Sequence, residues 1–537
     1  TQSLDLTLAT QTTGRWVNRP NVTGLNQPSN VTLRGTRVGS GLFNVTVTGD
    51  VAGVQLTTQR PFALSESDEV VDSGEAEINT ADITPFLLLL GDGAGVKPPV
   101  PVNARVALGR LRDSSSFNVT GKIAGNDVQA QLNARSRSEI GGEISVDKLS
   151  LPWLTAALAL NVPGDPAATS IWSTAKFGQS GRLVSGGQVV FRAGTLDLGR
   201  GLQGTRASFT LEAQSDGISI RNLETSIGNG RMTGSTTITR QGEMATVVGE
   251  GALQDVPLWA LGGASPFEAT LSGSLRFGSA GANVSELVSA LGGAGDWRVT
   301  RLRVPSADPS VFDRALKRAL AENEPLIEGK AETIVGTELG KASLAASTVN
   351  TSAALVGGLL RLSPFVVEGG PATWQGAVAY DLKTLQLDAR GFLVAKTSPQ
   401  GWTGAPPSIG LNWRGSLAAP VREVDAGPFR NGLAAIVLKR ELEKIEAFER
   451  AAAERQRQIQ AQQDAERQRA KAAAEEAARQ ARAQAEADRA RRDAERLQSE
   501  QQRTPDEPEE APAPDTVPST LPPFNMTPPS ATGVPER

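Results

Sequence analysis

The sequence predicts a mainly β protein: an elongated, repeating antiparallel sheet with short helical insertions, followed by one long C-terminal α-helix and a disordered tail. Three observations support this. Apolar and polar residues alternate along many short stretches up to about residue 425, as in strands with one buried face. Val, Thr, Leu and Ile dominate these stretches, and many of the 56 Gly separate them. Residues 433–502 contain neither Gly nor Pro, which is helix composition.

The residue types that are missing exclude several kinds of chemistry. The 537 residues include no Cys and no His, so disulfides, thiolates and imidazole ligands or bases are excluded. A net charge of −4 and a pI near 5.4 argue against a nucleic-acid partner. We therefore expect a protein that is not an enzyme and that has no cofactor and no metal.

Residues 1–182 are predicted to form a β-rich repeat region. Its strongest signal is a hairpin around the turn residues Gly125, Asn126 and Asp127. Residues of one phase on its two strands are the first candidates for an apolar lining: Phe117, Val119, Ile123, Val128 and Leu132. The apolar run at 151–160 is shorter than the roughly 20 residues of a membrane span. We interpret the strand-like start of the chain, without Met, as a fragment whose anchor or signal has been left out.

Two larger units recur with irregular spacing. Residues 142–154, 249–261 and, more weakly, 74–87 each read as a strand that breaks near a Pro and enters a short apolar helical turn. Residues 223–234 and 365–376 each read as a strand, a Gly-rich turn and a second strand. The pattern indicates a divergent array of repeats.

Residues 183–427 continue the strands, with helical insertions near 284–291 and 310–322. Strand-like alternation at 207–212 and 234–239 adds Phe209, Leu211 and Ile238 to the candidate lining. A long sheet with one apolar face has to bury that face. Either the sheet packs on another sheet, or it curls into a groove whose apolar lining contacts a lipid chain. The alternation of apolar and polar residues is the same in both arrangements, so the sequence does not choose between them.

Residues 428–503 are predicted to be a long charged helix, and residues 504–537 a Pro- and acid-rich disordered tail. Coiled-coil spacing of apolar residues begins the helix but is not sustained beyond Ile459, so the helix should be solvated. We expect its start to dock on the last strands, near Trp413 or Leu417, through Leu438, Leu442, Ile445 and Phe448.

Other motifs have plainer interpretations. Asn-X-Ser/Thr triplets suit the turns and wet faces of a Thr-rich sheet better than glycosylation; those considered begin at Asn21, Asn30, Asn44, Asn118, Asn283 and Asn525. Gly-rich stretches at 91–95 and 292–295 lack the rest of a phosphate-binding motif and are predicted turns. Nothing selects a carboxylate pair for catalysis among Glu66, Asp68, Glu69, Glu143 and Asp147.

Several of these stretches also share the strand order and Gly placement of one family. Residues 196–199, 207–211, 216–223 and 228–234 have its sequence of strands, and 271–275 with 284–295 resemble its Gly-rich helix–turn–strand element. Residues 359–369, 374–387, 407–411 and 415–420 are similar to its closing strands. On these grounds residues 183–427 resemble the C-terminal region of the AsmA family of bacterial envelope proteins, and residues 1–182 resemble it more loosely. Residues 304–308 depart from it, because the family continues there with a Gly turn and a strand.

The resemblance implies a curved, repeating β-groove in the bacterial periplasm, anchored to the inner membrane through a missing N-terminal segment. It implies phospholipid acyl chains as partners, a part in lipid transport and outer-membrane biogenesis, and no catalytic residues. Other envelope proteins are expected to bind the C-terminal helix. Two alternatives remain: a structural or chaperone-like factor for outer-membrane protein assembly, and a surface-exposed β-rich adhesin.

Overall fold

The described residues form one open, mainly antiparallel sheet, several short helices and one long helix. The structure, a computed structural model, describes residues 3–19, 22, 24–39, 41–65, 70–89, 99–111, 114–136, 139–160, 171–178 and 186–499. Thr1–Glu441 form one compact unit, called the body below, and Leu442–Arg537 form a second. The predicted fold class is confirmed, because the strands belong to one sheet that does not close on itself. The predicted tail at 504–537 lies outside the described residues.

The first part of the body, up to the predicted boundary at 182, contains mostly strands. Its elements are β1 (Ser3–Thr10), η1 (Thr13–Arg15), β2 (Ser29–Arg37), β3 (Leu42–Val51), β4 (Val54–Arg60), β5 (Phe62–Ser65), β6 (Val70–Asp72), β7 (Gly74–Thr80), α1 (Thr84–Leu89), β8 (Val102–Leu111), β9 (Ser114–Ile123), β10 (Asn126–Ser136), β11 (Glu139–Ser150), α2 (Leu151–Thr155) and the π-helical η3 (Ala156–Leu160).

The second part continues the same sheet. Its elements are β12 (Gly187–Gly199), β13 (Leu202–Gln214), β14 (Gly217–Ile227), β15 (Gly230–Gln241), β16 (Met244–Pro257), α3 (Trp259–Gly262), β17 (Glu268–Gly281), α4 (Val284–Ser289), β18 (Gly292–Val304), α5 (Val311–Ala321), α6 (Lys330–Leu339), β19 (Leu344–Val356), β20 (Leu359–Gly369), β21 (Ala372–Asp381), β22 (Gln386–Ala395), β23 (Ser408–Ser416), β24 (Val421–Asp425) and α7 (Gly427–Ser499).

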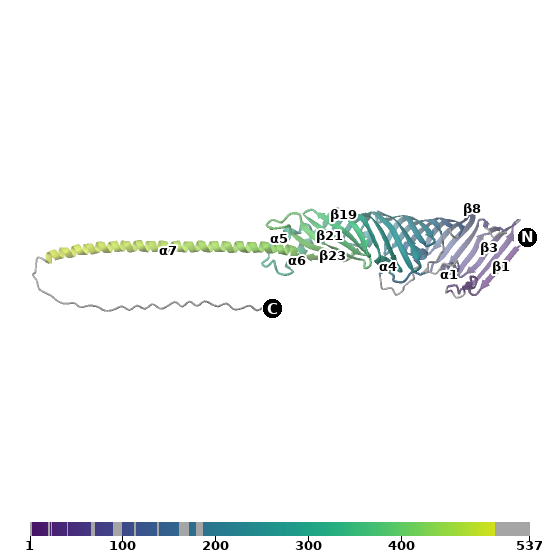
Figure 1. The fold of residues 1–537 in the computed structure, drawn as a ribbon, viewed down its shortest axis with the longest axis horizontal. Helices are drawn as coiled ribbons and strands as arrows, with labels where there is room; N and C mark the ends of the chain where they lie inside the picture. Colours follow the sequence, from purple (N-terminus) through teal and green to yellow (C-terminus); the bar gives the residue numbers. More distant parts are fainter. Residues whose placement is uncertain are drawn as a thin grey trace. The chain divides into compact units, whose positions relative to one another are not determined.

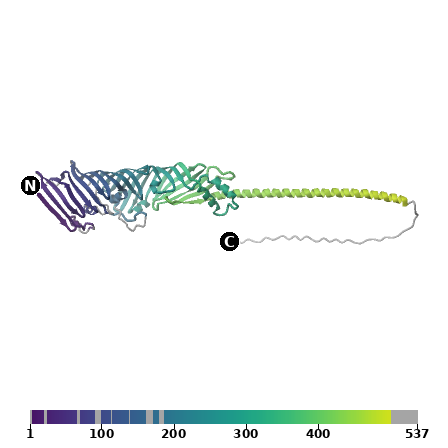
Figure 2. The same cartoon turned by 180° about the vertical axis from the view of Figure 1, so that it is seen from behind.

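Most described strands pair antiparallel with their neighbours in the chain, so strand order follows the sequence (Figures 1 and 2). The predicted hairpin is β9–β10, with Phe117 opposite Leu132. Its turn is at Ala124 and Gly125, which both have positive φ, one residue before the predicted position. Among the described pairs, only β11 and β12 run parallel. These two strands flank residue 182, so the sheet continues across the predicted boundary.

Bulges bend the sheet from β13 to β18. Arg206, Asn222, Asp255 and Arg301 each have a φ of 52–54°, and each lies where the strand register shifts. A bulge places two residues opposite one and increases the local twist. The repeated bulges in neighbouring strands therefore account for the curl of the body.

The predicted strand-to-helix units are confirmed, because β7, β11 and β16 each lead into a short helix, at α1, α2 and α3. The predicted insertions are α4 and α5. α6 was not predicted, because its sequence KAETIVGTEL is rich in poor helix formers. Packing stabilises it, since Ile334, Val335 and Leu339 are buried in the core at the C-terminal end of the sheet. α5 and α6 lie between Val304, the last residue of β18, and the start of β19.

Candidate functional site

The candidate site is the apolar face of the sheet, called the inner face below. Residues directly opposite each other on paired strands lie on the same face. One such row crosses six strands and is entirely apolar: Val106, Val119, Ala130, Ile144, Phe191 and Phe209. The rings of Phe191 and Phe209 stack with centroids 5.1 Å apart. The alternation read from separate strands therefore combines into continuous apolar rows.

All eight predicted lining residues lie on the inner face, but they divide into two groups by burial. Phe117, Val119, Ile123 and Leu132 are half-buried. Phe209, Leu211, Ile238 and Val128 are at most 9% exposed. The first group is thus partly open to solvent and the second is covered.

The cover over β12–β15 is formed by α2 and η3, which directly follow β11. Leu154 of α2 and Ala159 of η3 are buried in one core cluster with Phe209, Leu211 and Ile238. The sequence predicted a short apolar helical turn at the start of 151–160 and a run too short to span a membrane, but not that the run packs on the sheet. A run of apolar residues in a connecting segment was the signal that it packs on the sheet.

Arg240 attaches this cover to β15. It is 7% exposed, and its guanidinium donates to the carbonyl oxygens of Ala159 and Leu160 at 2.9 and 3.0 Å. It also donates to Gly178 and Gly242 and lies over the ring of Phe177 at 5.3 Å. Burial lowers the pKa of this guanidinium. Four carbonyl oxygens accept hydrogen bonds from the two terminal nitrogens of this buried cation, and these bonds fix the groups that carry the carbonyls.

A second cover closes the inner face at its C-terminal end. Helices α5 and α6 and the first turns of α7 share one core cluster with β18–β24. Trp374 lies at the centre of this cluster. It is 2% exposed, its Nε1 donates to the Leu411 carbonyl at 2.9 Å, and its ring contacts Phe365 and Trp413.

The predicted docking residues of the helix are wrong. Leu438, Leu442, Ile445 and Phe448 are exposed by 52–69%. The helix is instead fixed by Phe429, Leu433 and Ile436, which are buried with Trp413 in the C-terminal core. With about 100° between successive residues, Leu438, Leu442 and Ile445 fall on the opposite side of the helix from these three. The helix nevertheless packs near Trp413, as the sequence predicted, but through different residues.

Between the two covers, part of the inner face remains half-buried. Leu253, Leu275 and Phe277 on β16 and β17 point inward but belong to neither core cluster. Toward the N-terminal end the inner face opens further. Leu4, Leu6 and Leu8 of β1 are 42–57% exposed, and β1 pairs only with β2 among the described strands.

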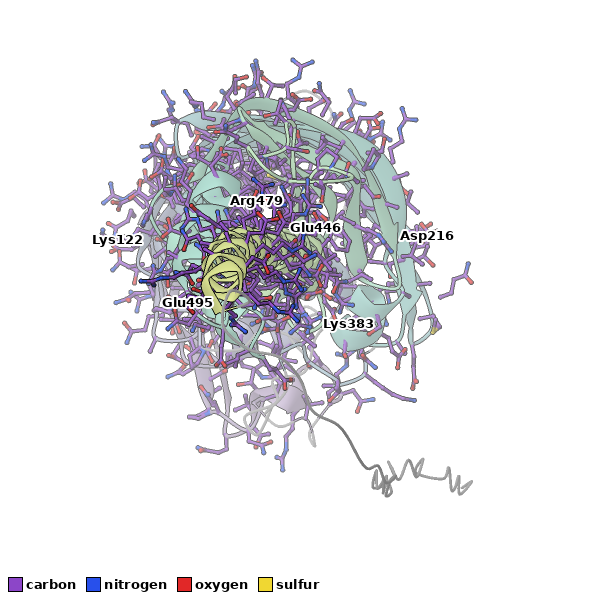
Figure 3. The ribbon with its side chains drawn as sticks, turned by 90° about the vertical axis from the view of Figure 1, so that its left-hand side faces the viewer. Lys122, Asp216, Lys383, Glu446, Arg479 and Glu495 are labelled. Atoms are coloured by element: carbon purple, nitrogen blue, oxygen red, sulfur yellow. The ribbon has the colours of Figure 1, made fainter. Side chains whose placement is uncertain are left out.

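The opposite, outer face is polar and carries cross-strand ion pairs, such as Arg192–Glu143 and Arg276–Glu250. Lys122 and Asp216 lie on the outside of the body in Figure 3. A depression of about 990 Å³ crosses β14–β19 on this face, between Glu224, Glu250 and Asp296. Its lining includes acidic residues, unlike the apolar rows of the inner face.

The remaining motifs have structural roles or lie outside the described residues. Asn283 caps α4, with its Oδ1 accepting the Glu286 backbone N–H at 2.8 Å. Gly292 and Gly293 begin β18 instead of forming a turn. Glu143 is paired with Arg192. The Gly-rich stretch at 91–95, Glu66, Asp68, Glu69, Asn21 and Asn525 are not among the described residues.

Across the described ranges, no three acidic side chains gather as a metal ion would require. No helix in those ranges is both long and apolar enough to cross a bilayer. Comparisons with protein-family models, with curated proteins and with solved structures found no match.

Proposed function

We propose that the inner face binds phospholipid acyl chains and that the protein is a non-enzymatic periplasmic factor. Its role would be lipid transport between the inner and outer bacterial membranes and outer-membrane biogenesis. The observation that carries the proposal is the apolar row across β8–β13, which passes from half-buried to fully covered side chains. Burying a CH₂ group contributes about 0.8 kcal/mol, so an extended acyl chain along such a row would be held without polar contacts. The resemblance to the AsmA family agrees with this proposal.

The proposal is tested by a matched pair of substitutions on β10. Leu132 is a half-buried inner-face residue, and its neighbour Gln131 is exposed on the outer face. Leu132→Asp should reduce the phospholipid that co-purifies with the protein, because an ionised carboxylate against an acyl chain costs several kcal/mol. Gln131→Asp should leave the amount unchanged. The measurement is phospholipid per mole of protein by mass spectrometry, with circular dichroism as a control for folding.

A wild-type protein that carries no phospholipid would contradict the proposal. It would favour the second candidate, a structural or chaperone-like factor for outer-membrane protein assembly. The exposed apolar residues of α7, Leu438, Leu442, Ile445 and Phe448, favour that candidate, because unpartnered side chains of this size suit a protein partner.

A further inference from the structure

The N-terminal end of the body is positively charged, although the whole chain has a net charge of −4. Residues 6–49 contain Arg15, Arg19, Arg34 and Arg37 but no Lys, Asp or Glu. β1 lies at this end of the body (Figures 1 and 2), and it pairs only with β2 among the described strands. A surface with this charge attracts anionic partners.

The loop between β1 and β2 holds two of these arginines on either side of an exposed tryptophan. The Arg19 backbone N–H donates to the Gly14 carbonyl at 2.7 Å and closes the base of the loop. Residues 15–19, called the arginine–tryptophan loop below, are all exposed, and Trp16 and Val17 are 40% and 37% exposed. A hydrogen-bonded turn therefore holds two large apolar side chains in water.

The leucines of β1 extend this surface toward the inner face. Leu4, Leu6 and Leu8 lie on one face of the strand and are 42–57% exposed. From Leu8, an unbroken row of apolar residues and glycines crosses the paired strands as far as β10. Its members are Leu8, Val31, Gly49, Leu56, Ile78, Ala104, Gly121 and Val128. The N-terminal edge is thus the start of the inner face.

A tryptophan between arginines has the chemistry of a group that binds at the boundary between lipid and water. The Trp ring is apolar and its N–H is polar, so the side chain is stable at the level of the headgroups. An Arg side chain near an anionic leaflet is attracted by the negative surface potential of the lipid. A bilayer also accepts an exposed apolar loop without a shaped pocket, which a protein partner would have to provide.

We propose that the N-terminal end of the body docks on an anionic phospholipid surface through the arginine–tryptophan loop, with the leucines of β1 facing the lipid. Arg15 and Arg19 contact phosphate groups, and Trp16 enters the upper part of the acyl-chain region. Docking goes beyond lipid binding by the inner face and does not require it. It adds the place at which a phospholipid leaves a membrane and reaches the row that starts at Leu8.

The absence of Cys from the chain allows one position of the loop to be labelled with an environment-sensitive fluorophore. Val17→Cys keeps Trp16 in place. Val366→Cys on β20 is the matched control, because Val366 is 39% exposed and Val17 is 37% exposed. Vesicles of phosphatidylethanolamine with phosphatidylglycerol should increase the emission of the label at position 17 and shift it to shorter wavelength. The label at position 366 should not respond.

Substitution of the tryptophan tests the apolar part of the surface in the unlabelled protein. Trp16→Ala should weaken binding to the same vesicles by about tenfold in a flotation assay, because the ring no longer leaves water. Trp153→Ala on α2 is the control, since Trp153 is 39% exposed and Trp16 is 40% exposed. This control variant should bind as the wild type does.

Substitution of the arginines tests the charged part. Arg15→Gln with Arg19→Gln should weaken binding to phosphatidylglycerol vesicles by about fivefold for each arginine. The difference from the wild type should become small at high salt, which screens the surface potential. Arg303→Gln with Arg361→Gln, at two exposed positions of β18 and β20, removes the same charge elsewhere and should have no such effect.

The outcomes separate docking from lipid binding by the inner face. A wild-type protein that does not bind phosphatidylglycerol vesicles would overturn docking, as would binding without a response of the label at position 17. Equal losses for Trp16→Ala and Trp153→Ala would also overturn docking through this loop. Phospholipid that co-purifies with a protein unable to bind vesicles would leave the inner-face proposal standing while docking fails. Vesicle binding through the loop by a protein that carries no phospholipid would support docking and contradict the inner-face proposal.

Discussion

Large inner-face side chains lie over glycines of neighbouring strands. At Gly391 of β22, an added Cβ would lie 2.6 Å from the Trp374 ring and 2.5 Å from the Gln375 carbonyl oxygen. At Gly273 of β17, it would lie 2.9 Å from the Trp297 ring. The absence of a side chain at these positions lets the ring lie flat against the neighbouring strand, which a tightly curled sheet requires.

Gly391→Ala should therefore destabilise the body by about 1–3 kcal/mol, because backbone and a buried ring would have to shift. Gly251→Ala on the same face is the control, since its Cβ would have only the Thr233 carbonyl oxygen within reach, at 3.8 Å. Chemical denaturation of both variants measures the difference. Equal losses of stability in the two variants would contradict this explanation. They would mean that the close approach of Trp374 is not the reason for a glycine at position 391.

Sequence patterns predicted which residues point inward, because alternation in a strand has a fixed period of two. Phe117, Leu132 and Phe209 all lie on the predicted face. The close approach of the Trp374 ring to Gly391 was not predictable, because it depends on the register between β21 and β22. The burial of each lining residue was not predictable either. It depends on whether another part of the chain, such as α2 and η3, packs over that residue.

The α5–α6 pair is held by a buried ionic network. Glu338 is 2% exposed, and its carboxylate accepts hydrogen bonds from Arg314 and Lys341, both at 2.8 Å. The hydrogen bond from Lys341 and then that from Arg314 hold the pKa of the Glu338 carboxyl below its ordinary value of 4.5. Asp308, 5% exposed, shares Arg314 through a second ion pair.

This network predicts acid sensitivity of the helical cover. Because the folded-state pKa of Glu338 is lowered, its contribution is fully present above pH 4.5 and is lost as the pH falls through the folded-state pKa. Glu338→Gln should cost about 1–3 kcal/mol at pH 7, since it leaves Arg314 with a weaker partner, and less at pH 3. Denaturation at both pH values gives the comparison.

Glu368→Gln is the control for this experiment. Its ion pair with Lys396 is exposed, with side-chain exposures of 70% and 41%. We expect no measurable loss of stability, because exposed pairs are screened by water. An equal loss for Glu338→Gln at pH 3 and pH 7 would show that shape, and not charge, is what Glu338 contributes.

At the scale of whole elements, composition identified α7 but not α6. Gly427–Ser499 forms one continuous helix, with Pro428 in its first turn, close to the predicted 428–503. Glu446 and Arg450, one turn apart on the helix, form an ion pair at 3.7 Å. Charged side chains such as Glu446, Arg479 and Glu495 project from it (Figure 3). A solvated helix such as α7 can be predicted from its composition alone. α6 cannot, because its helical conformation is stabilised by packing on the core.

For the molecule as a whole, alternation could not distinguish an open groove from a closed sandwich, and the structure has features of both. The sheet is open, yet its inner face is covered over β12–β15 and again at its C-terminal end. The parallel pairing of β11 with β12 creates the first cover. This pairing joins residues that are far apart in the sequence. A local pattern of apolar and polar residues therefore cannot predict it.

The body should be independent of most of the long helix. Deleting residues from 442 onward removes none of the buried residues of the C-terminal core, so the thermal unfolding of the body should not change. Leu433→Ala should lower its stability by about 2–5 kcal/mol, because the Leu433 side chain is fully buried and a cavity would remain. Calorimetry of both variants tests the boundary between the two units.

Leu442→Ser with Ile445→Ser serves as the control within the same helix. Both side chains are more than half exposed, so the double variant should keep the stability of the body within about 0.5 kcal/mol. A loss as large as that of Leu433→Ala would show that this side of the helix packs on the sheet in solution. Unchanged body stability, together with lost binding of an envelope protein, would instead assign these exposed residues to a partner.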